Sequence, residues 1–502
     1  MADVFGMETY GAGPDSWNAG SDKLTGDLRR KYNFGDRVSE LAIAQDPFFR
    51  FVSKVAKKPT DDPEFKFTER RGSFHKRYAY TTAHGASSSV ATTGDATIAA
   101  GAVDAGDTYY FKMGTDYENK GNMTSISGQS TGAVAVGDAN TAPQFFLNDQ
   151  VVKINYRAAG EGSAFTTPTG YLLAKIKSVT AVSTTHQILQ CEIVKGTSSS
   201  VDLMWESDTA AVSTVYNKTI ATDLEPKRCY VVGSAHGQGT GYPDTWKDQP
   251  FSTGFGLTQI WKTAMAMDNT TRATVLKYEP NEFARIWREK LIEHKFDIEQ
   301  SLLFGSQSTA TDGVQYTQGA VDFCVNYGNI FTGSTIGTTK SQDDFLDDMS
   351  QFLDPRYNNS NATLFLVSTD VYNWFHKLGG YVNANMRKTD LGSANSFAAT
   401  SEFSIGGKKN VYGVNITQVY TPYGVMNLAR NIHLDGTEIK ILAVNMKYCA
   451  YRPLVGNGLN RDTAVYVGVQ TLENSGVDRR VDLIQTEAGM EWQMPEAHAV
   501  WK

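Results

Sequence analysis

The chain has 502 residues, of which 41% are apolar and 20% charged, so it can build several cores and is not disordered throughout. Its formal net charge of −7 argues against a protein that grips nucleic acid along one strongly basic face. The start of the chain lacks the pattern of a signal peptide, and no apolar run approaches the ~20 residues of a spanning helix. We therefore expect a soluble protein kept inside a cell.

The first forty residues are rich in Gly, Asp and Asn and carry scattered aromatic residues, which predicts an arm that packs on another surface. Asp46–Val55 is the first firm element, a short apolar segment introduced by Asp-Pro. Phe65–Tyr80 alternates aromatic and charged residues, a pattern typical of a strand or a long ribbon.

The composition then changes to Thr, Ala, Ser, Gly and Asp over Thr81–Gly137. Three β-type runs follow at short spacing: Asp149–Tyr156, Gly170–Thr180 and Gln187–Lys195. They predict an inserted β-rich module over about residues 83–230. Aromatic, ribbon-like sequence returns at Tyr242–Met267, as expected if two arms of one excursion flank the module.

The strongest helix signal is Pro280–Phe304, closed by Gly305. Apolar residues at spacings of four or seven predict one continuous packing face. That face consists of Phe283, Trp287, Leu291, Ile298 and Leu302. On the remaining surface we expect two i,i+4 ion pairs, Arg285 with Glu289 and Lys295 with Glu299.

A second helix is predicted at Ser341–Leu353, followed by a buried strand at Thr363–Ser368 and a third helix at Asp370–Leu378. This order of elements is typical of an α/β domain. From Val411 onward the chain alternates strands and turns.

Motifs for chemistry are lacking. Gly333–Ser341 approaches a phosphate-binding loop, but Thr339 stands where glycine must precede Lys340, so we expect no nucleotide site. No two histidines lie three to five residues apart, which leaves no helical metal pair, and no nucleophile elbow is present. We expect no catalytic residue, metal or cofactor, and a protein that is not an enzyme.

Two clusters of charge allow a second interpretation. His294 lies beside Glu293 and Asp297, where solvated ion pairing is favoured over a metal site. Four acids stand at the start of the second helix, where they either hold a cation or, as we favour, complement the helix dipole. They are Asp343, Asp344, Asp347 and Asp348. The cysteines, which lack any CxxC, are expected to be reduced and buried. They are Cys191, Cys229, Cys324 and Cys449.

The order of these segments resembles the major capsid proteins of tailed bacteriophages, which share the HK97-type fold with encapsulins. The run EFARIWREKLIEHKFDIEQSLLFG at Glu282–Gly305 is similar to the spine helix of that fold. The other similar runs are Phe67–Phe74 and Gly254–Thr263 in the extended loop, Phe345–Trp374 in the axial domain, and Leu442–Pro453 and Val481–Pro495 in the closing strands.

The resemblance implies an α+β HK97-like capsid fold with an inserted small β-rich domain where the family has a plain hairpin. The implied divisions are an N-terminal arm at 1–58, an extended loop at 59–82 and 231–275, the β-rich module at 83–230, a peripheral domain at 276–320 and 450–502 with the spine helix at 281–304, and an axial domain at 321–449.

The implied function is a major capsid protein that self-assembles into an icosahedral shell around double-stranded DNA. Implied partners are further copies in hexamers and pentamers, scaffolding, portal and decoration or cement proteins, and loosely contacted DNA, with no membrane. The implied location is the virion, after assembly in the host cytoplasm. Two alternatives remain open: an encapsulin-like compartment and a β-rich surface binding protein.

Charges on the extended loop and on the spine helix are the candidates for contacts between subunits. The candidates are Glu69, Arg70, Arg71, Arg285, Arg288 and Glu289. For about half of these side chains, a solvated position with no partner is the alternative.

Overall fold

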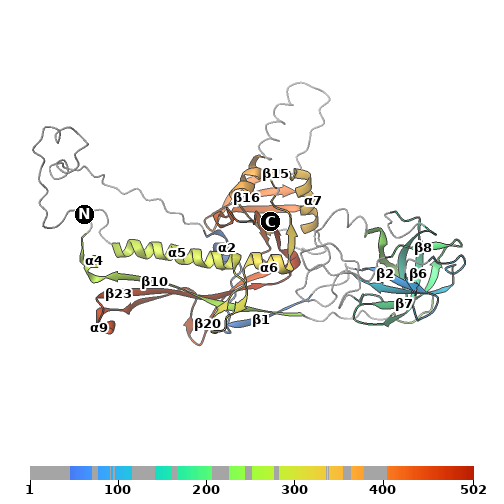
Figure 1. Ribbon diagram of the computed structural model, residues 1–502, viewed down its shortest axis with the longest axis horizontal. Coiled ribbons are helices and arrows are strands. Elements are labelled where there is room, and N and C mark those ends of the chain that lie inside the picture. The colour runs from blue at the N-terminus through green and yellow to red at the C-terminus, as the bar shows by residue number, and fades with distance from the viewer. Residues whose placement is uncertain are drawn as a thin grey trace, which may run out of the picture.

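The computed structural model of the chain describes residues 46–70, 77–90, 92–93, 97–115, 142–160, 167–205, 225–243, 252–275, 282–334, 336, 339–353, 363–377 and 404–502. The predicted N-terminal arm before Asp46 lies outside the described residues. Figure 1 shows an elongated molecule, with a long ribbon and helix at one end, a second sheet standing on it, and a separate β structure at the other end.

A five-stranded sheet forms the base of the molecule. Its order is β1-β10-β23-β19, and β22 pairs with β23 beside that path. The strands are β1 (Glu64–Glu69), β10 (Ser252–Asp268), β19 (Cys449–Pro453), β22 (Ala464–Gln470) and β23 (Arg479–Trp492). β10 and β23 pair antiparallel from Thr258–Gly489 to Asp268–Arg479, while the first part of β10 pairs with β1. The ribbon is thus formed by antiparallel strands: β1 pairs with the first part of β10, and the rest of β10 pairs with β23 in the base sheet.

Helix α5 (Glu282–Phe304) lies along this sheet, as Figure 1 shows. Its 23 residues span about 35 Å. α2 (Pro47–Val55) and α6 (Ala320–Tyr327) pack near its C-terminal end. α2 begins at a proline, which suits the first helical turn because backbone N–H groups there make no hydrogen bond within the helix, so the N–H that proline lacks is not needed. The short apolar segment at Asp46–Val55 is thus a helix, and the predicted helix at 281–304 is confirmed.

A seven-stranded mixed sheet has the order β13-β24-β18-β14-β17-β16-β15. Its strands are β13 (Asn329–Phe331), β14 (Thr363–Val367), β15 (Ser404–Val411), β16 (Val414–Thr421), β17 (Gly424–Arg430), β18 (Ile441–Val444) and β24 (Ala499–Trp501). The pairs β14–β17 and β13–β24 are parallel. α7 (Gln342–Phe352) confirms the second predicted helix, and residues 369–377 confirm the third.

The position of β14 between two cores explains why its sequence is apolar at successive positions. Leu364 and Leu366 point into the core shared with α2, α5 and α6. Phe365 and Val367 point into a second core with α7 and Trp501. A strand covered on both faces needs apolar side chains on both, and the run TLFLV supplies them.

The β-rich segment forms a closed barrel. The chain of pairs runs β2-β4-β7-β6-β5, and β9 pairs with both β2 and β5, which closes the ring. The strands are β2 (Tyr78–Gly85), β4 (Thr108–Gly114), β5 (Gln150–Ala158), β6 (Gly170–Ala181), β7 (Gln187–Lys195) and β9 (Arg228–Ser234), with β3 (Thr92–Thr93) and β8 (Val201–Leu203) attached. The three predicted β runs are confirmed as β5, β6 and β7.

The barrel has a core of its own, built from side chains such as Phe111, Ile154 and Leu189 that contact neither of the other cores. The remaining short elements are α4 (Asn269–Ala273), α9 (Leu472–Ser475), the hairpins β11–β12 (Ser308–Thr309, Gln315–Tyr316) and β20–β21 (Val455–Gly456, Leu459–Asn460), and the 3-10 turns η2 (Glu225–Lys227), η3 (Ile432–Leu434) and η4 (Pro495–Ala497). All four cysteines are buried and form no disulfide, as predicted.

Candidate assembly surface

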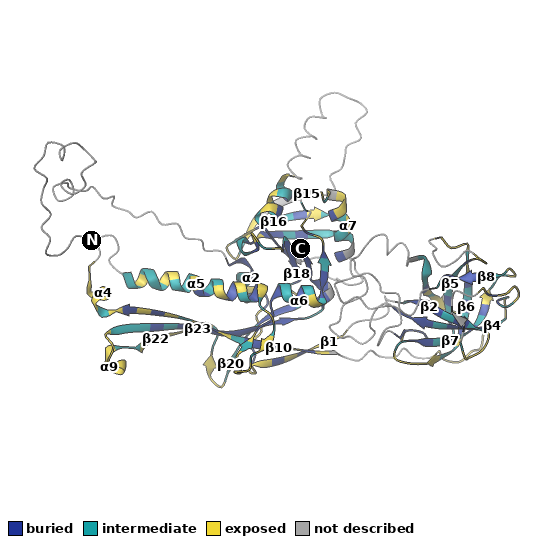
Figure 2. Ribbon diagram, viewed as in Figure 1, coloured by how far each residue is buried: buried dark blue, intermediate teal, exposed yellow. Residues whose placement is uncertain are grey.

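The predicted packing face of α5 is buried along only half of its length. Ile298 and Leu302 are fully buried in the core beneath the seven-stranded sheet. Phe283, Trp287 and Leu291 are half-buried, because the N-terminal half of the helix extends with the ribbon beyond that sheet. Figure 2 shows this change along α5, from dark blue near α6 to teal and yellow toward α4.

Two polar residues lie on the buried side of α5, and sequence reasoning placed both in solvent. The His294 ring is completely buried, with Nδ1 2.9 Å from Thr263 Oγ1 and Nε2 2.8 Å from Thr486 Oγ1. The two threonines stand on β10 and β23, so the ring links both strands to the helix. Burial lowers the pKa of His294, which favours the neutral ring. The predicted solvated ion pairing of His294 is wrong.

Glu299 is the second residue, and the predicted ion pair with Lys295 is also wrong. Its carboxylate accepts hydrogen bonds from the backbone N–H of Phe48 at 3.1 Å and of Phe49 at 2.6 Å. Asn431 Nδ2 donates a third bond at 2.9 Å. Glu299 thus caps the start of α2 and ties it to α5 and to the segment after β17. Complete burial raises the pKa of Glu299 to about 7.

The candidate charges differ in their surroundings. Glu69 is buried within the chain, where its Oε1 accepts from the Met494 backbone N–H at 2.8 Å. Arg70 is exposed at the end of β1, and Arg71 lies outside the described residues. On α5, Arg285 contacts both Glu282 and Glu289, with 2.6 Å to Glu289, as the predicted i,i+4 pair requires. Arg288 is exposed.

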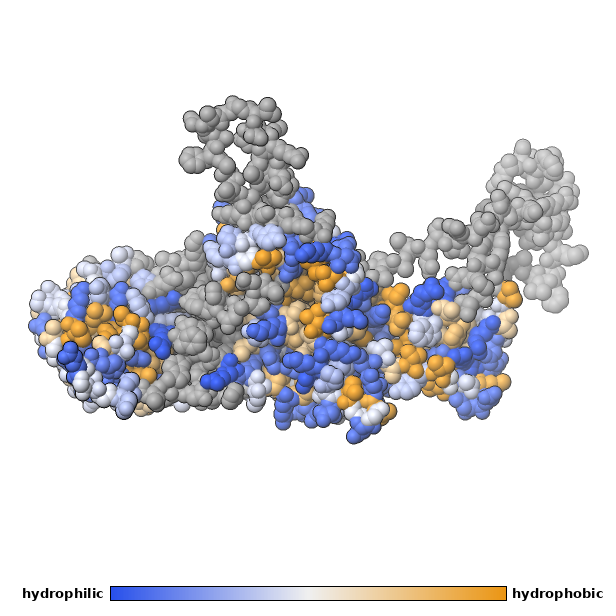
Figure 3. All heavy atoms as spheres, turned by 180° about the vertical axis from the view of Figure 1, so that it is seen from behind, coloured by the Kyte–Doolittle hydropathy of each residue, from blue (hydrophilic) through white to orange (hydrophobic). Residues whose placement is uncertain are grey.

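The largest group of exposed apolar side chains on the ribbon lies at its far end, on β22, α9 and the turn into β23. We call these six side chains the ribbon patch. They are Val465, Tyr466, Val467, Val469, Leu472 and Val477, with Val467 65% exposed. Figure 3 shows apolar residues gathered along this end of the molecule. Among the described residues, β22 pairs with β23 alone, so its other edge is open.

The strands and turns predicted from Val411 onward include the run TAVYVGVQ at 463–470, but the prediction did not indicate that this strand is uncovered. The available signal was its composition: valines and tyrosine fill successive positions, so both faces need cover. The described chain covers neither face fully. Isolated edge strands of this kind are usually protected by charge or covered by another element.

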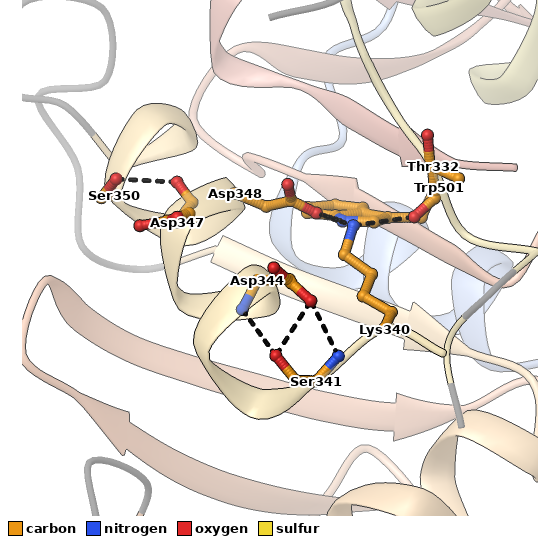
Figure 4. Close-up of polar contacts among 8 residues, drawn as sticks. All are labelled: Thr332, Lys340, Ser341, Asp344, Asp347, Asp348, Ser350 and Trp501. Carbon is orange, nitrogen blue, oxygen red and sulfur yellow. Dashed lines mark hydrogen bonds and ion pairs between the residues drawn. The ribbon is translucent and has the colours of Figure 1, made fainter. Parts of the chain in front are cut away.

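The acids at the start of α7 form hydrogen bonds and an ion pair within the chain (Figure 4). Asp344 and Ser341 cap the helix reciprocally, with the Asp344 N–H 3.2 Å from Ser341 Oγ and the Ser341 N–H 3.0 Å from Asp344 Oδ2. Asp348 accepts from Lys340 and, at 2.9 Å, from Trp501 Nε1. Burial raises the pKa of Asp348.

Lys340, from the segment that resembles a phosphate-binding loop, also donates to the Thr332 carbonyl at 2.8 Å. Its contacts with Thr332 and Asp348 therefore stabilise the fold. Across the described ranges, no group of three His, Cys, Asp or Glu residues is arranged to hold a metal ion. The helices within those ranges include none that is long and apolar enough to cross a membrane.

The sequence and the structure were compared with known proteins. A family model described as "SU10 major capsid protein" matches residues 32–502. No curated protein matches the sequence. The chain is similar to a solved structure from Microbacterium phage Oxtober96, with 14% identity over 54% of this chain and 80% of that chain and a TM-score of 0.33.

Two further solved structures give similar values. The capsid of an empty GTA particle is 12% identical over 54% of this chain and 80% of that chain, with a TM-score of 0.32. The capsid of Myoviridae phage XM1 is 12% identical over 53% of this chain and 80% of that chain, also with a TM-score of 0.32.

Proposed function

The chain belongs to the SU10 major capsid protein family, and we propose that it builds the capsid shell through two exposed surfaces at opposite ends of its long sheet. The observation that carries the shell function is the family match, which spans nearly the whole chain. Formation of an icosahedral viral capsid is thus its function, and the predicted HK97-like α+β class holds. The role is structural, and we infer that the protein catalyses no reaction.

The first surface is the ribbon patch, together with the half-buried side chains Phe283, Trp287 and Leu291 of α5. Several exposed apolar side chains close together in the chain indicate a binding surface, because a monomeric soluble protein rarely leaves large apolar areas uncovered. Here we infer that a neighbouring copy covers it. Phe283 is half-buried, and the guanidinium groups of Arg272 and Arg480 lie over its ring, at 5.6 and 4.8 Å.

The second surface is the hairpin of β1 with the start of β10. Phe255 is 54% exposed there, and Arg70 ends the strand in solvent. A hairpin with little core of its own gains stability when it lies on another subunit. Arg70 and Arg288 are exposed and remain candidates for charge pairs between subunits, and Arg71 remains a candidate outside the described residues. Glu69 is buried within the chain, and Arg285 and Glu289 pair with each other on α5.

The wider set of partners is part of the proposal. We infer hexamers and pentamers of this chain, with scaffolding, portal and decoration or cement proteins joining during assembly in the host cytoplasm. The net charge of −7 is consistent with loose, nonspecific contact to packaged double-stranded DNA. The proposed division into arm, extended loop, β-rich module, peripheral and axial domains keeps the order given above, with two changed boundaries. The barrel strands extend the β-rich module to Tyr78–Ser234, and β24 (Ala499–Trp501) belongs to the seven-stranded sheet.

Assembly of the purified chain tests the proposal. We expect light scattering and negative-stain electron microscopy to show closed particles or discrete pentamers and hexamers. DNA as the cargo in particles from infected cells would separate the capsid from an encapsulin-like compartment, which encloses protein. A 55.1 kDa species that stays monomeric with the other head proteins present would end the proposal.

A substitution in the ribbon patch tests the first surface. Val467→Asp places a charge on its most exposed valine and should leave folded subunits that do not form shells. Val182→Asp is the matched control, because Val182 is a similarly exposed valine (52%) on the barrel, away from the ribbon. Equal shell yields from both variants would remove the ribbon patch from the assembly surface.

A further inference from the structure

A row of side chains crosses four strands on the outside of the barrel. The strand registers place Lys195 of β7 opposite Leu173 of β6, Leu173 opposite Lys153 of β5, and Lys153 opposite Tyr230 of β9. Leu172 and Cys229, the sequence neighbours of Leu173 and Tyr230, point into the barrel core, as do both neighbours of Lys153, while Lys195 is itself exposed. The row therefore faces outward, and three steps of about 4.8 Å between strands make it about 14 Å long.

The two lysines of this row contact aromatic rings instead of carboxylates. Lys195 Nζ lies 3.9 Å and Lys153 Nζ 4.6 Å from the centroid of the Tyr171 ring, which adjoins the row. Lys153 Nζ also donates to Tyr230 Oη at 3.1 Å. Neither ammonium group lies within 4.0 Å of an acid in the described part of the chain. A hydrogen bond from Lys195, together with its positive charge, lowers the pKa of Tyr171.

The adjacent lysines of β6 provide the contrast. Lys175 pairs with Asp149 at 2.9 Å, and Lys177 pairs with Glu192 at 2.5 Å. Within the described residues, acids neutralise Lys175 and Lys177 but not Lys153 and Lys195, which lie on a face with two exposed tyrosines. We call Lys153, Tyr171, Leu173, Lys195 and Tyr230 the barrel row.

We propose that the barrel row binds an acidic surface of a neighbouring copy of this chain in the assembled shell. The inference rests on the proposed self-assembly and adds a contact that the ribbon and the hairpin do not make. A chain of net charge −7 presents an excess of carboxylates to its neighbours, which complements two uncompensated cations. Exposed tyrosines suit a protein interface, because they bury much area at a small entropy cost.

The number of cations argues against nucleic acid as the partner. Two lysines that neutralise two phosphates give a salt slope of about −1.8 on duplex DNA, against about −5 to −9 for proteins with 6–10 phosphate contacts. Such binding is too weak to hold DNA through this face. A contact between subunits needs little affinity of its own, because the shell repeats it at high effective concentration.

Zero-length carbodiimide crosslinking tests the contact directly. Shells assembled from equal amounts of ¹⁴N and ¹⁵N chains are crosslinked, and the peptides are analysed by mass spectrometry. We expect mixed-isotope peptides that join Lys153 or Lys195 to an Asp or Glu. Shells that form normally but yield only same-isotope peptides, or none, at these lysines would overturn the inference while leaving the proposed function intact.

Charge reversal tests how much the barrel row contributes to the association of subunits. Lys153→Glu with Lys195→Glu should lower the association constant between subunits about fivefold per contact, measured as shell dissociation in urea at low salt. The difference from wild type should disappear in high salt. Lys175→Glu with Lys177→Glu is the matched control on the next row of the same barrel, and near-ultraviolet circular dichroism of free subunits checks folding.

Two outcomes of the charge-reversal experiment would also refute the proposal. The reversal variant could dissociate in urea like the control at every salt concentration, which would show that the barrel row contacts no neighbouring subunit. The loss could instead occur only in DNA-filled shells and not in empty ones, which would identify nucleic acid as the partner.

Discussion

Glu299→Gln probes the buried carboxylate that joins α2, α5 and the segment after β17. The pKa of Glu299 rises from an ordinary value of 4.5 to about 7, mainly because burial disfavours the charged form. The unfolded chain loses this proton near pH 4.5 and the folded chain near pH 7. Between these values the folded state binds more protons, so stability must fall as the pH rises.

The size of the effect follows from that interval. At 1.36 kcal/mol per pH unit, the carboxyl stabilises the fold fully below pH 4.5 and loses about 3 kcal/mol of that contribution by pH 8. Glutamine at position 299 does not titrate, so this part of the pH dependence disappears. The free energy of unfolding of wild type, relative to the variant, should therefore fall by about 3 kcal/mol from pH 4.5 to pH 8.

Urea unfolding of free subunits, followed by far-ultraviolet circular dichroism from pH 4.5 to pH 8, measures this difference. Glu293→Gln is the control, because it makes the same chemical change at an exposed position of the same helix. Parallel stability curves for wild type and Glu299→Gln would refute the assignment of Glu299 as a buried acid that holds α2. A difference of the opposite sign would show that its three hydrogen bonds outweigh burial.

Three further predictions concern packing. Ile298→Ala should cost the free subunit about 3 kcal/mol and Leu291→Ala about 1 kcal/mol in urea unfolding, because only Ile298 is fully buried; equal losses would contradict the exposed position of the N-terminal half of α5. Lys340→Gln should lower the free energy of unfolding by about 3 kcal/mol, because it removes the cation beside the buried Asp348 and leaves Trp501 as its hydrogen-bond donor. An unchanged urea midpoint would contradict a stabilising ion pair between Lys340 and Asp348. Replacing residues 77–243 with a Gly/Ser linker should leave a soluble subunit with a cooperative thermal transition, since the barrel has its own core; an insoluble product would argue otherwise.

Local signals in the sequence were sufficient for many of the elements. The apolar spacing of α5, the proline that starts α2 and the continuous apolar run of β14 each report a short-range property: a helix face, an allowed first turn, or a strand covered twice. The run at Glu282–Gly305 also carried the resemblance to phage capsid proteins, and the family match supports that assignment. Neighbouring residues are enough for such features, because each depends on a period or on one turn of backbone.

Contacts between distant segments were decided by the tertiary structure alone. Glu299 looked like half of a surface ion pair until the N-terminus of α2, some 250 positions earlier, placed two N–H groups against it. β9 closes the barrel by pairing with β2 and β5, and no local pattern distinguishes it from an ordinary hairpin strand. The ribbon patch is apolar in sequence like any buried strand. Only the folded chain leaves it exposed, because burial depends on which surfaces meet.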